Sequence, residues 1–297
     1  MTTLGLSSRG APMAARPAAA QDRTSGLRGV WAVYRSELAK LALQVRVRSA
    51  IGLCLVGPFV FVVVERTQTT LPTDTPFGRW VHDSGFAVPL VILGFAGLWL
   101  VPALTSAVAG DIFACEDRFG TWKTILTRSR SRSQIFAGKT LAAMTYTTMV
   151  VLLLAASSVV ASLLLVGNQP LVGLTGQSIA PGRAFALVLY AWATTLPPAL
   201  GFTALALLVS VVTRSAPAGV GAPVVIGLGM QLYAMADGSD VVRMLLLTTP
   251  FTAWHGLLAA TPYFGPLIWG AVTSLLYVTA CLGLAHQVFR RRDIVAS

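Results

Sequence analysis

The sequence has few charged residues for its length. Only 11% of its 297 residues are Asp, Glu, Lys or Arg, whereas 55% are hydrophobic. Soluble globular domains carry about 25% charged residues. So small a charged fraction cannot cover a surface that faces water, and we expect most of the surface to face lipid. The composition therefore predicts an integral membrane protein.

Side chains that bind metals or perform catalysis are also scarce. The three cysteines and three histidines are widely dispersed along the chain. The cysteines have neither the spacing of a metal site nor that of a disulfide framework. We interpret Cys54, Cys115 and Cys281 as small packing residues. The sequence thus offers no metal site and no catalytic cluster.

Long hydrophobic stretches are present instead. Each one can cross a hydrocarbon core of about 30 Å as a helix with a rise of about 1.5 Å per residue. The first is the shortest, and we expect it to gain length from the helix before it. The six stretches are residues 49–64, 86–110, 139–166, 184–212, 216–236 and 264–287. They predict an all-α integral membrane protein with six transmembrane helices.

Three other segments flank these spans. Residues 1–26 lack an apolar run, and we expect a disordered cytoplasmic tail. Apolar residues recur at helical steps in residues 27–48, which predicts a helix lying in the membrane interface, or alternatively one packed on a partner. Residues 241–261 contain Pro250 and His255. We expect short helices there, either at the outer surface or re-entrant.

The basic residues lie mostly on one side of the predicted spans. Eight Lys and Arg occur in residues 9–48, and six occur from Arg118 to Lys139, which stands at the edge of its loop. Arg214 and residues 290–292 lie on the same side. The other side has four, namely Arg66, Arg79, Arg183 and Arg243. Because cytoplasmic loops are enriched in Lys and Arg, both chain ends are predicted to be cytoplasmic, and the net charge of +11 requires no nucleic-acid partner.

The sequence contains no evident source of energy for transport. The predicted spans three to six lack Asp and Glu, whereas a secondary transporter keeps ionisable groups inside its bundle. Gly138-Lys139-Thr140 resembles the end of a phosphate-binding loop, but that motif needs a glycine where Ser133 stands. We therefore expect no cofactor on this chain, and any energy must come from another subunit.

The predicted cytoplasmic loop at residues 111–133 mixes charged and aromatic side chains. Trp122, Ile125 and Leu126 share one face of a helix. A short amphipathic helix with charged residues at its rim could dock to a soluble partner. An ordinary interfacial anchor is the alternative interpretation.

The order of motifs in this loop resembles that of the ABC-2 type permeases, which are the membrane subunits of ABC exporters. The family pattern has Glu, three residues, Gly-Thr, Leu, a turn with Pro, Ser-Arg and then Gly-Lys. The corresponding residues here are Glu116, Gly120, Thr121, Leu126, Ser131, Arg132, Gly138 and Lys139. Ser129 stands in place of the proline, and the ending Phe289-Arg-Arg-Arg-Asp293-Ile294 is also similar to the family's.

The resemblance covers about residues 27–294 and carries several implications. It implies a pair of permeases, identical or related, in a bacterial cytoplasmic membrane, with two ABC ATP-binding subunits that bind ATP and Mg. The cargo would be hydrophobic or amphipathic, such as a drug, antibiotic peptide or lipid. The implied ATPase-coupling residues are Glu116, Arg118, Phe119, Gly120, Thr121, Trp122, Leu126, Ser131 and Arg132. A non-transporting assembly or sensor subunit that binds an ATPase, and a secondary transporter, remain alternatives.

The predicted fifth span has small residues on one face. Gly219, Pro223 and Gly227 are four residues apart, so they lie on the same side of a helix. Helices in lipid pack closely where small residues let their backbones approach. Two interpretations stay open. The small face packs against another span of this chain, or it lines the substrate route or the contact between two permeases, as the resemblance implies.

Overall fold

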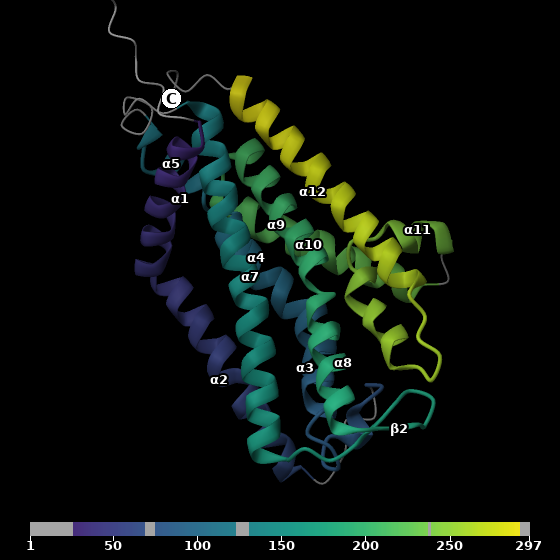
Figure 1. Cartoon of the computed structure of the whole chain (residues 1–297). Helices are drawn as coiled ribbons and strands as arrows, with labels where there is room; N and C mark the ends of the chain where they lie inside the picture. Colours follow the sequence, from purple (N-terminus) through teal and green to yellow (C-terminus); the bar gives the residue numbers. More distant parts are fainter. Residues whose placement is uncertain (1–25, 69–74, 123–130, 237–238, 292–297) are drawn as a thin grey trace, which may run out of the picture.

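A computed structural model describes residues 26–68, 75–122, 131–236 and 239–291 (Figure 1). Within these residues, six helical stretches are long and apolar enough to cross a membrane, which confirms the predicted number. They are Val45–Thr67, Ala87–Arg118, Arg132–Leu165, Pro181–Thr213, Ala216–Met235 and Gly265–Arg291. The chain is a multi-pass membrane protein. The predicted tail lies outside the described residues apart from Gly26.

The first two helices are separated by a break at Gln44. Helix α1 spans Gly26–Leu43 and α2 spans Val45–Thr67. Gln44 has an extended backbone, with φ −75° and ψ 129°, so the α-helix cannot run through it. The break falls earlier than predicted, and α2 is correspondingly longer than residues 49–64. Helix α1 packs along α7 (Arg132–Leu165) of its own chain, and its position at a membrane interface remains a prediction.

The second span is built from successive helical pieces. Helix α3 (Ala87–Phe95) continues through a π-helical turn, η2 (Ala96–Leu100), into α4 (Val101–Ala109). Pro102 lacks the N–H that would bond Leu98, and its ring would crowd that carbonyl, so the wider turn accommodates it. A short helix, α5 (Ala114–Arg118), follows directly.

A hairpin between the third and fourth spans departs from the predicted all-α fold. Strands β1 (Leu171–Val172) and β2 (Ser178–Ile179) pair antiparallel, with Leu171 opposite Ile179. The chain turns between them at Gly176, whose φ of +83° suits glycine. A loop of this length gave no alternating pattern from which such a short pair could be predicted.

Proline also divides the fourth span. Helices α8 (Pro181–Ala193) and α9 (Leu196–Thr213) are separated just before Pro197. At the break, the hydroxyl of Thr195 donates to the Trp192 carbonyl at 2.7 Å, in addition to the bond that this carbonyl accepts from the Thr195 N–H at 3.1 Å. Helix α10 (Ala216–Met235) forms the fifth span.

Short helices precede the last span, as predicted. They are α11 (Asp240–Leu245) and the 3-10 helix η3 (Thr249–Leu258), and a further 3-10 turn, η1 (Gly78–Trp80), precedes α3. Helix α11 and η3 lie beside the first half of α12 (Gly265–Arg291), where Pro250 touches Gly270. Whether they are re-entrant remains a prediction.

Helices α1, α5 and the end of α12 lie at one end of the bundle, which we call the α1 end, and the β-hairpin lies at the other (Figure 1). Arg132, at the start of α7, donates to the carbonyl of Arg290 near the end of α12.

Helices α2, α10 and α12 are peripheral, since only 28%, 17% and 22% of the residues in their most apolar segments are buried. Their outer faces are therefore available to lipid or to another protein.

Candidate functional site

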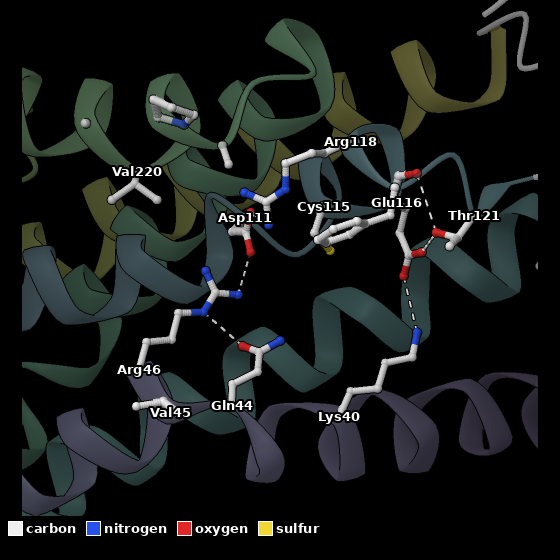
Figure 2. Close-up of a pocket in the computed structure, with 14 residues that line it drawn as sticks. Lys40, Gln44, Val45, Arg46, Asp111, Cys115, Glu116, Arg118, Thr121 and Val220 are labelled. Carbon is white, nitrogen blue, oxygen red and sulfur yellow. Dashed lines mark hydrogen bonds and ion pairs between the residues drawn. The ribbon is translucent and has the colours of Figure 1, made fainter.

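The residues that match the sequence motifs gather at the α1 end of the bundle. Their centre is a cluster of four ionised side chains from α1, α5 and α7, namely Glu37, Lys40, Glu116 and Lys139. We call this cluster the charged joint. Figure 2 shows part of it, with Lys40 extending from α1 toward Glu116.

Lys139 is the most deeply buried member of the charged joint. Its side chain is 1% exposed, and its ammonium lies 3.0 Å from a Glu37 oxygen and 2.9 Å from a Glu116 oxygen. It also donates to the carbonyl of Ile112 at 3.0 Å, so all three of its donors have an acceptor. The sequence placed this lysine at the edge of a loop. That placement is wrong, because Lys139 lies inside helix α7 and faces α1 and α5.

Lys40 completes the charge balance from the rim of the joint. Its ammonium lies 2.9 Å from Glu37 and 3.2 Å from Glu116, and its side chain is 51% exposed. Burial alone would lower the pKa of Lys40, but hydrogen bonds and charges from Glu37 and Glu116 raise it instead. Two cations and two carboxylates thus form a neutral set, which is the condition for burying charge at tolerable cost.

The Glu-x-x-x-Gly-Thr motif has a defined local structure. The N–H of Thr121 bonds the Glu116 carbonyl at 3.0 Å, and the N–H of Gly120 bonds the Asp117 carbonyl at 3.2 Å. This is the Schellman pattern that closes a helix, and Gly120 adopts the required left-handed conformation at φ +62°. The Thr121 hydroxyl also bonds the carboxylate of Glu116. The motif therefore ends α5 and orients Glu116 toward Lys139.

The Ser-Arg and Gly-Lys motifs fix the start of α7. Ser131 is the N-cap of the helix and forms a capping box with Gln134. Arg132 bonds the carbonyl of Arg290 at 3.0 Å. A side chain at Gly138 would lie 2.6 Å from Val33, so glycine here lets α1 approach α7 closely.

An aromatic cluster supports the joint from the side of α12. Trp122 is 4% exposed, and its ring centroid lies 5.3 Å from that of Phe289. Phe113 lies 5.4 Å from Phe289, and Phe136 also packs there. From the sequence, Trp122 was expected on a helix face that docks to a partner protein. In the structure Trp122 is buried against its own chain.

Four of the described coupling residues are exposed, namely Arg118, Phe119, Gly120 and Ser131. Phe119 is 69% exposed, and the Arg118 guanidinium lies 4.7 Å from the centre of its ring. Leu126 and the position of the usual proline, Ser129, lie outside the described residues. Phe119 has a large exposed apolar side chain, which places it to touch another protein, whereas the exposed Arg118 also faces Asp111 at 3.9 Å.

The small residues of α10 pack inside the chain. Gly219, Pro223 and Gly227 are the buried residues of this helix. A side chain at Gly219 would lie 2.2 Å from the carbonyl oxygen of Gly110, and one at Gly227 would lie 3.0 Å from Phe202 of α9. We call this contact the α10 seam. It matches the internal-packing interpretation, and the helix has other, exposed faces for a second protein.

Glu37 and Lys40 are the members of the joint that sequence reasoning missed. Glu37 lies beside the apolar stripe of α1, four residues before Leu41, and both Glu37 and Leu41 are buried. An acidic residue on the buried side of a helix was the available signal, because such a residue requires a partner. Among the described residues, no group of three or more His, Cys, Asp or Glu side chains is placed to hold a metal ion.

Comparison with known families gives one match. Residues 76–295 match a family described as "Protein of unknown function (DUF2705)". The chain belongs to this family. The match covers more than half of the sequence and includes the motif residues from Glu116 to Phe289, whereas Glu37 and Lys40 precede it. No curated protein matches the sequence.

Proposed function

We propose that this protein is the permease subunit of an ABC-2 type exporter, which moves its cargo with energy from separate ATP-binding subunits. The observation that carries the proposal is the convergence of the motif residues. Glu116, Gly120, Ser131 and Lys139 come from two helices and the turns beside them, and Phe289 comes from the far end of the chain, yet each has a defined role in or beside the charged joint. Scattered chance matches to short motifs would not be expected to meet in one place.

The proposed route of coupling begins at the exposed pair Phe119 and Arg118. A partner that binds these side chains would act on α5 through the closed turn at Gly120. Helix α5 presents Glu116 to Lys139, and Lys139 also contacts Glu37 of α1. Because a buried charge keeps its stabilisation only in good geometry, these elements should move together. Motion of the partner would then reach α1 and α7.

The remaining parts of the proposal follow from the same assignment. ATP and Mg would bind the partner subunits, and this chain would not hydrolyse ATP. The exposed faces of α2, α10 and α12 would meet lipid or a second permease, identical or related. The charged residues of the spans lie toward their ends and the middle parts are uncharged, which favours a hydrophobic or amphipathic cargo over an ion. The membrane would be the bacterial cytoplasmic membrane, with both chain ends in the cytoplasm.

Substitution of the exposed aromatic residue tests the docking site. We expect Phe119→Ala to weaken association with the ATP-binding subunit about 30-fold, because an interface anchor contributes about 2 kcal/mol. The measurement is binding of the purified subunit to the permease in lipid nanodiscs. Phe264→Ala is the matched control, since Phe264 is 55% exposed and precedes α12 at its opposite end. Equal binding by both variants and the wild type would show that the segment around Phe119 is not the docking site.

A transport assay separates the proposal from its alternatives. Vesicles that contain the permease and its ATP-binding subunit should move an amphipathic dye only when ATP is hydrolysed. Association without movement of any cargo would favour an assembly or sensor subunit. Movement driven by an ion gradient without the ATP-binding subunit would favour a secondary transporter.

Accessibility of single cysteines tests the proposed orientation. The native cysteines at positions 54, 115 and 281 would first be replaced. Gln177→Cys and Asp240→Cys should react with an impermeant thiol reagent in intact cells, whereas Ser131→Cys should react only after permeabilisation. Reaction of the Ser131 variant in intact cells would reverse the orientation.

A further inference from the structure

Two cavities lie between α2 and the second span, and we call the region that contains them the groove. The first is an apolar cavity of about 450 Å³. The lining residues include Leu53, Gly57 and Phe61 of α2, Phe95 and Trp99 of the second span, and Leu154 of α7. Gly57 leaves the α2 wall open, because a side chain added there would meet only Leu53, at 3.6 Å.

A second cavity, of about 850 Å³, lies at the α1 end and is lined by charged residues. Figure 2 shows Arg46 extending across it from α2 toward Asp111. The Arg46 guanidinium lies 2.6 Å from the Asp111 carboxylate and donates to the Ala107 carbonyl at 3.2 Å. Arg46 therefore bridges α2 and the second span at this end of the groove.

The two cavities lie along the same face of α2. Arg46 lines the charged cavity, and Leu53 and Gly57 line the apolar one. Leu53 and Gly57 follow Arg46 by seven and eleven residues, which are close to whole numbers of helical turns, so all three lie on one side of α2. Asp111 is twelve residues from Trp99, which corresponds to about 18 Å along a helix. That separation is close to the thickness of one leaflet, about 15 Å of hydrocarbon.

The charged cavity exposes its cations and buries its carboxylates. Lys40, Arg46 and Arg118 have side chains that are 51%, 36% and 57% exposed, whereas those of Asp111 and Glu116 are 6% and 7% exposed. Arg118 approaches Asp111 only to 3.9 Å, so its guanidinium retains donors for a ligand. The first turn of the 20-residue helix α10 also lines the cavity and adds the positive end of its dipole. The opening therefore favours an anionic group.

We propose that this groove binds an anionic phospholipid from the leaflet at the α1 end. The phosphate lies among Lys40, Arg46 and Arg118, and one acyl chain occupies the apolar cavity beside Trp99. A soluble anion would leave the apolar cavity unused, and a neutral lipid would leave the free donors of Arg118 unused. Basic pockets at the ends of transmembrane helices recognise lipid headgroups by this chemistry. The proposal concerns a bound lipid and holds whether or not the protein exports anything.

Native mass spectrometry of the purified permease alone can test the lipid. The probes are phosphatidylglycerol, phosphatidylcholine with the same acyl chains, and glycerol 3-phosphate. Phosphatidylglycerol should be retained about tenfold more strongly than phosphatidylcholine, given the contribution of each Lys or Arg near an anionic lipid. Glycerol 3-phosphate should not displace it at equal concentration. Equal retention of the two lipids would overturn the headgroup site, and displacement by glycerol 3-phosphate would overturn the role of the acyl chain.

Matched variants locate the two halves of the site. Arg118→Gln should lower retention of phosphatidylglycerol about fivefold, whereas Arg48→Gln should not, because Arg48 lies outside the cavity lining. Gly57→Leu should fill the apolar cavity and lower retention of both lipids about tenfold. Gly52→Leu is its control on the same helix, since a side chain there meets nothing within 4 Å. Wild-type retention by both Arg118→Gln and Gly57→Leu, in protein with unchanged thermal unfolding, would refute the proposal.

Discussion

The charged joint and the α10 seam hold helices together by different means. In the joint, α1, α5 and α7 meet through ionised side chains whose charges balance. In the seam, α10 meets the end of α4 where Gly219 lets the backbones touch, and it meets α9 where Gly227 leaves room for the Phe202 ring. The joint requires matched chemistry from distant parts of the sequence, whereas the seam requires only small size. A loss of function should therefore follow different substitutions at the two places.

The two regions should also differ in how they tolerate change. A buried ion that loses its partner is strongly destabilising, but removing both partners is much less so. A bulky substitution at a seam glycine cannot be compensated by a second side-chain substitution in this way, because the added atoms overlap the backbone of a neighbouring helix. Double substitutions thus separate the two mechanisms better than single ones.

The largest effect is expected at the centre of the joint. Lys139→Met should lower the free energy of unfolding by about 3–5 kcal/mol, because Glu37 and Glu116 would remain buried without it. The change would appear in thermal unfolding of the purified protein in nanodiscs. Lys40→Met is the matched control and should cost less, since Lys40 is half exposed. Addition of Glu116→Gln to Lys139→Met should recover part of the loss. Equal losses for the two lysines would show that burial does not determine the joint's contribution.

An intermediate effect is expected in the seam. Gly219→Leu should lower the free energy of unfolding by about 1–3 kcal/mol, because its side chain would overlap the Gly110 carbonyl. Gly229→Leu, on the same helix, should have little effect, since a side chain there meets nothing within 4 Å. Yield of monodisperse protein and its melting temperature would measure both. A stable Gly219→Leu variant that fails only to pair with a second permease would instead place the seam between subunits.

The smallest effect is expected at the turn that closes α5. Gly120→Ala should cost about 1 kcal/mol, because alanine is strained at φ +62°. Gly120→Asn should cost less, since asparagine adopts the left-handed conformation more readily. Comparison of the two melting temperatures provides the measurement. The same loss for both variants would argue that the turn conformation does not matter to the joint.

Much of the architecture was predictable because the membrane restricts the possibilities. The length of the apolar stretches identified each of the spans seen in the described residues. The ends of the helices differ from the predicted ends where capping residues or proline determine them. The position of the break at Gln44 and the π-helical turn before Pro102 were not predicted. They depend on backbone geometry rather than on hydrophobicity.

The candidate site was predicted only in part. Motif order selected Glu116, Gly120, Ser131 and Arg132, and the structure brings these residues to one end of the bundle. It did not distinguish residues that face outward from those that face inward. Trp122 is internal and Phe119 is exposed, although both are aromatic residues three positions apart in one charged loop.

The sequence by itself determined the class of protein, its spans and the small face of α10, because each follows from local composition and periodicity. Only the tertiary structure decided that Lys139 is buried between Glu37 and Glu116, and that Gly219 packs against Gly110 at the end of α4. The contact of Lys139 with Glu37 and that of Gly219 with Gly110 each join residues more than 100 positions apart. Local patterns show that a buried charge needs an ion-pair partner, or that one helix face is made of small residues. Which residue pairs with the charge, and which helix packs on that face, depends on how the helices pack together.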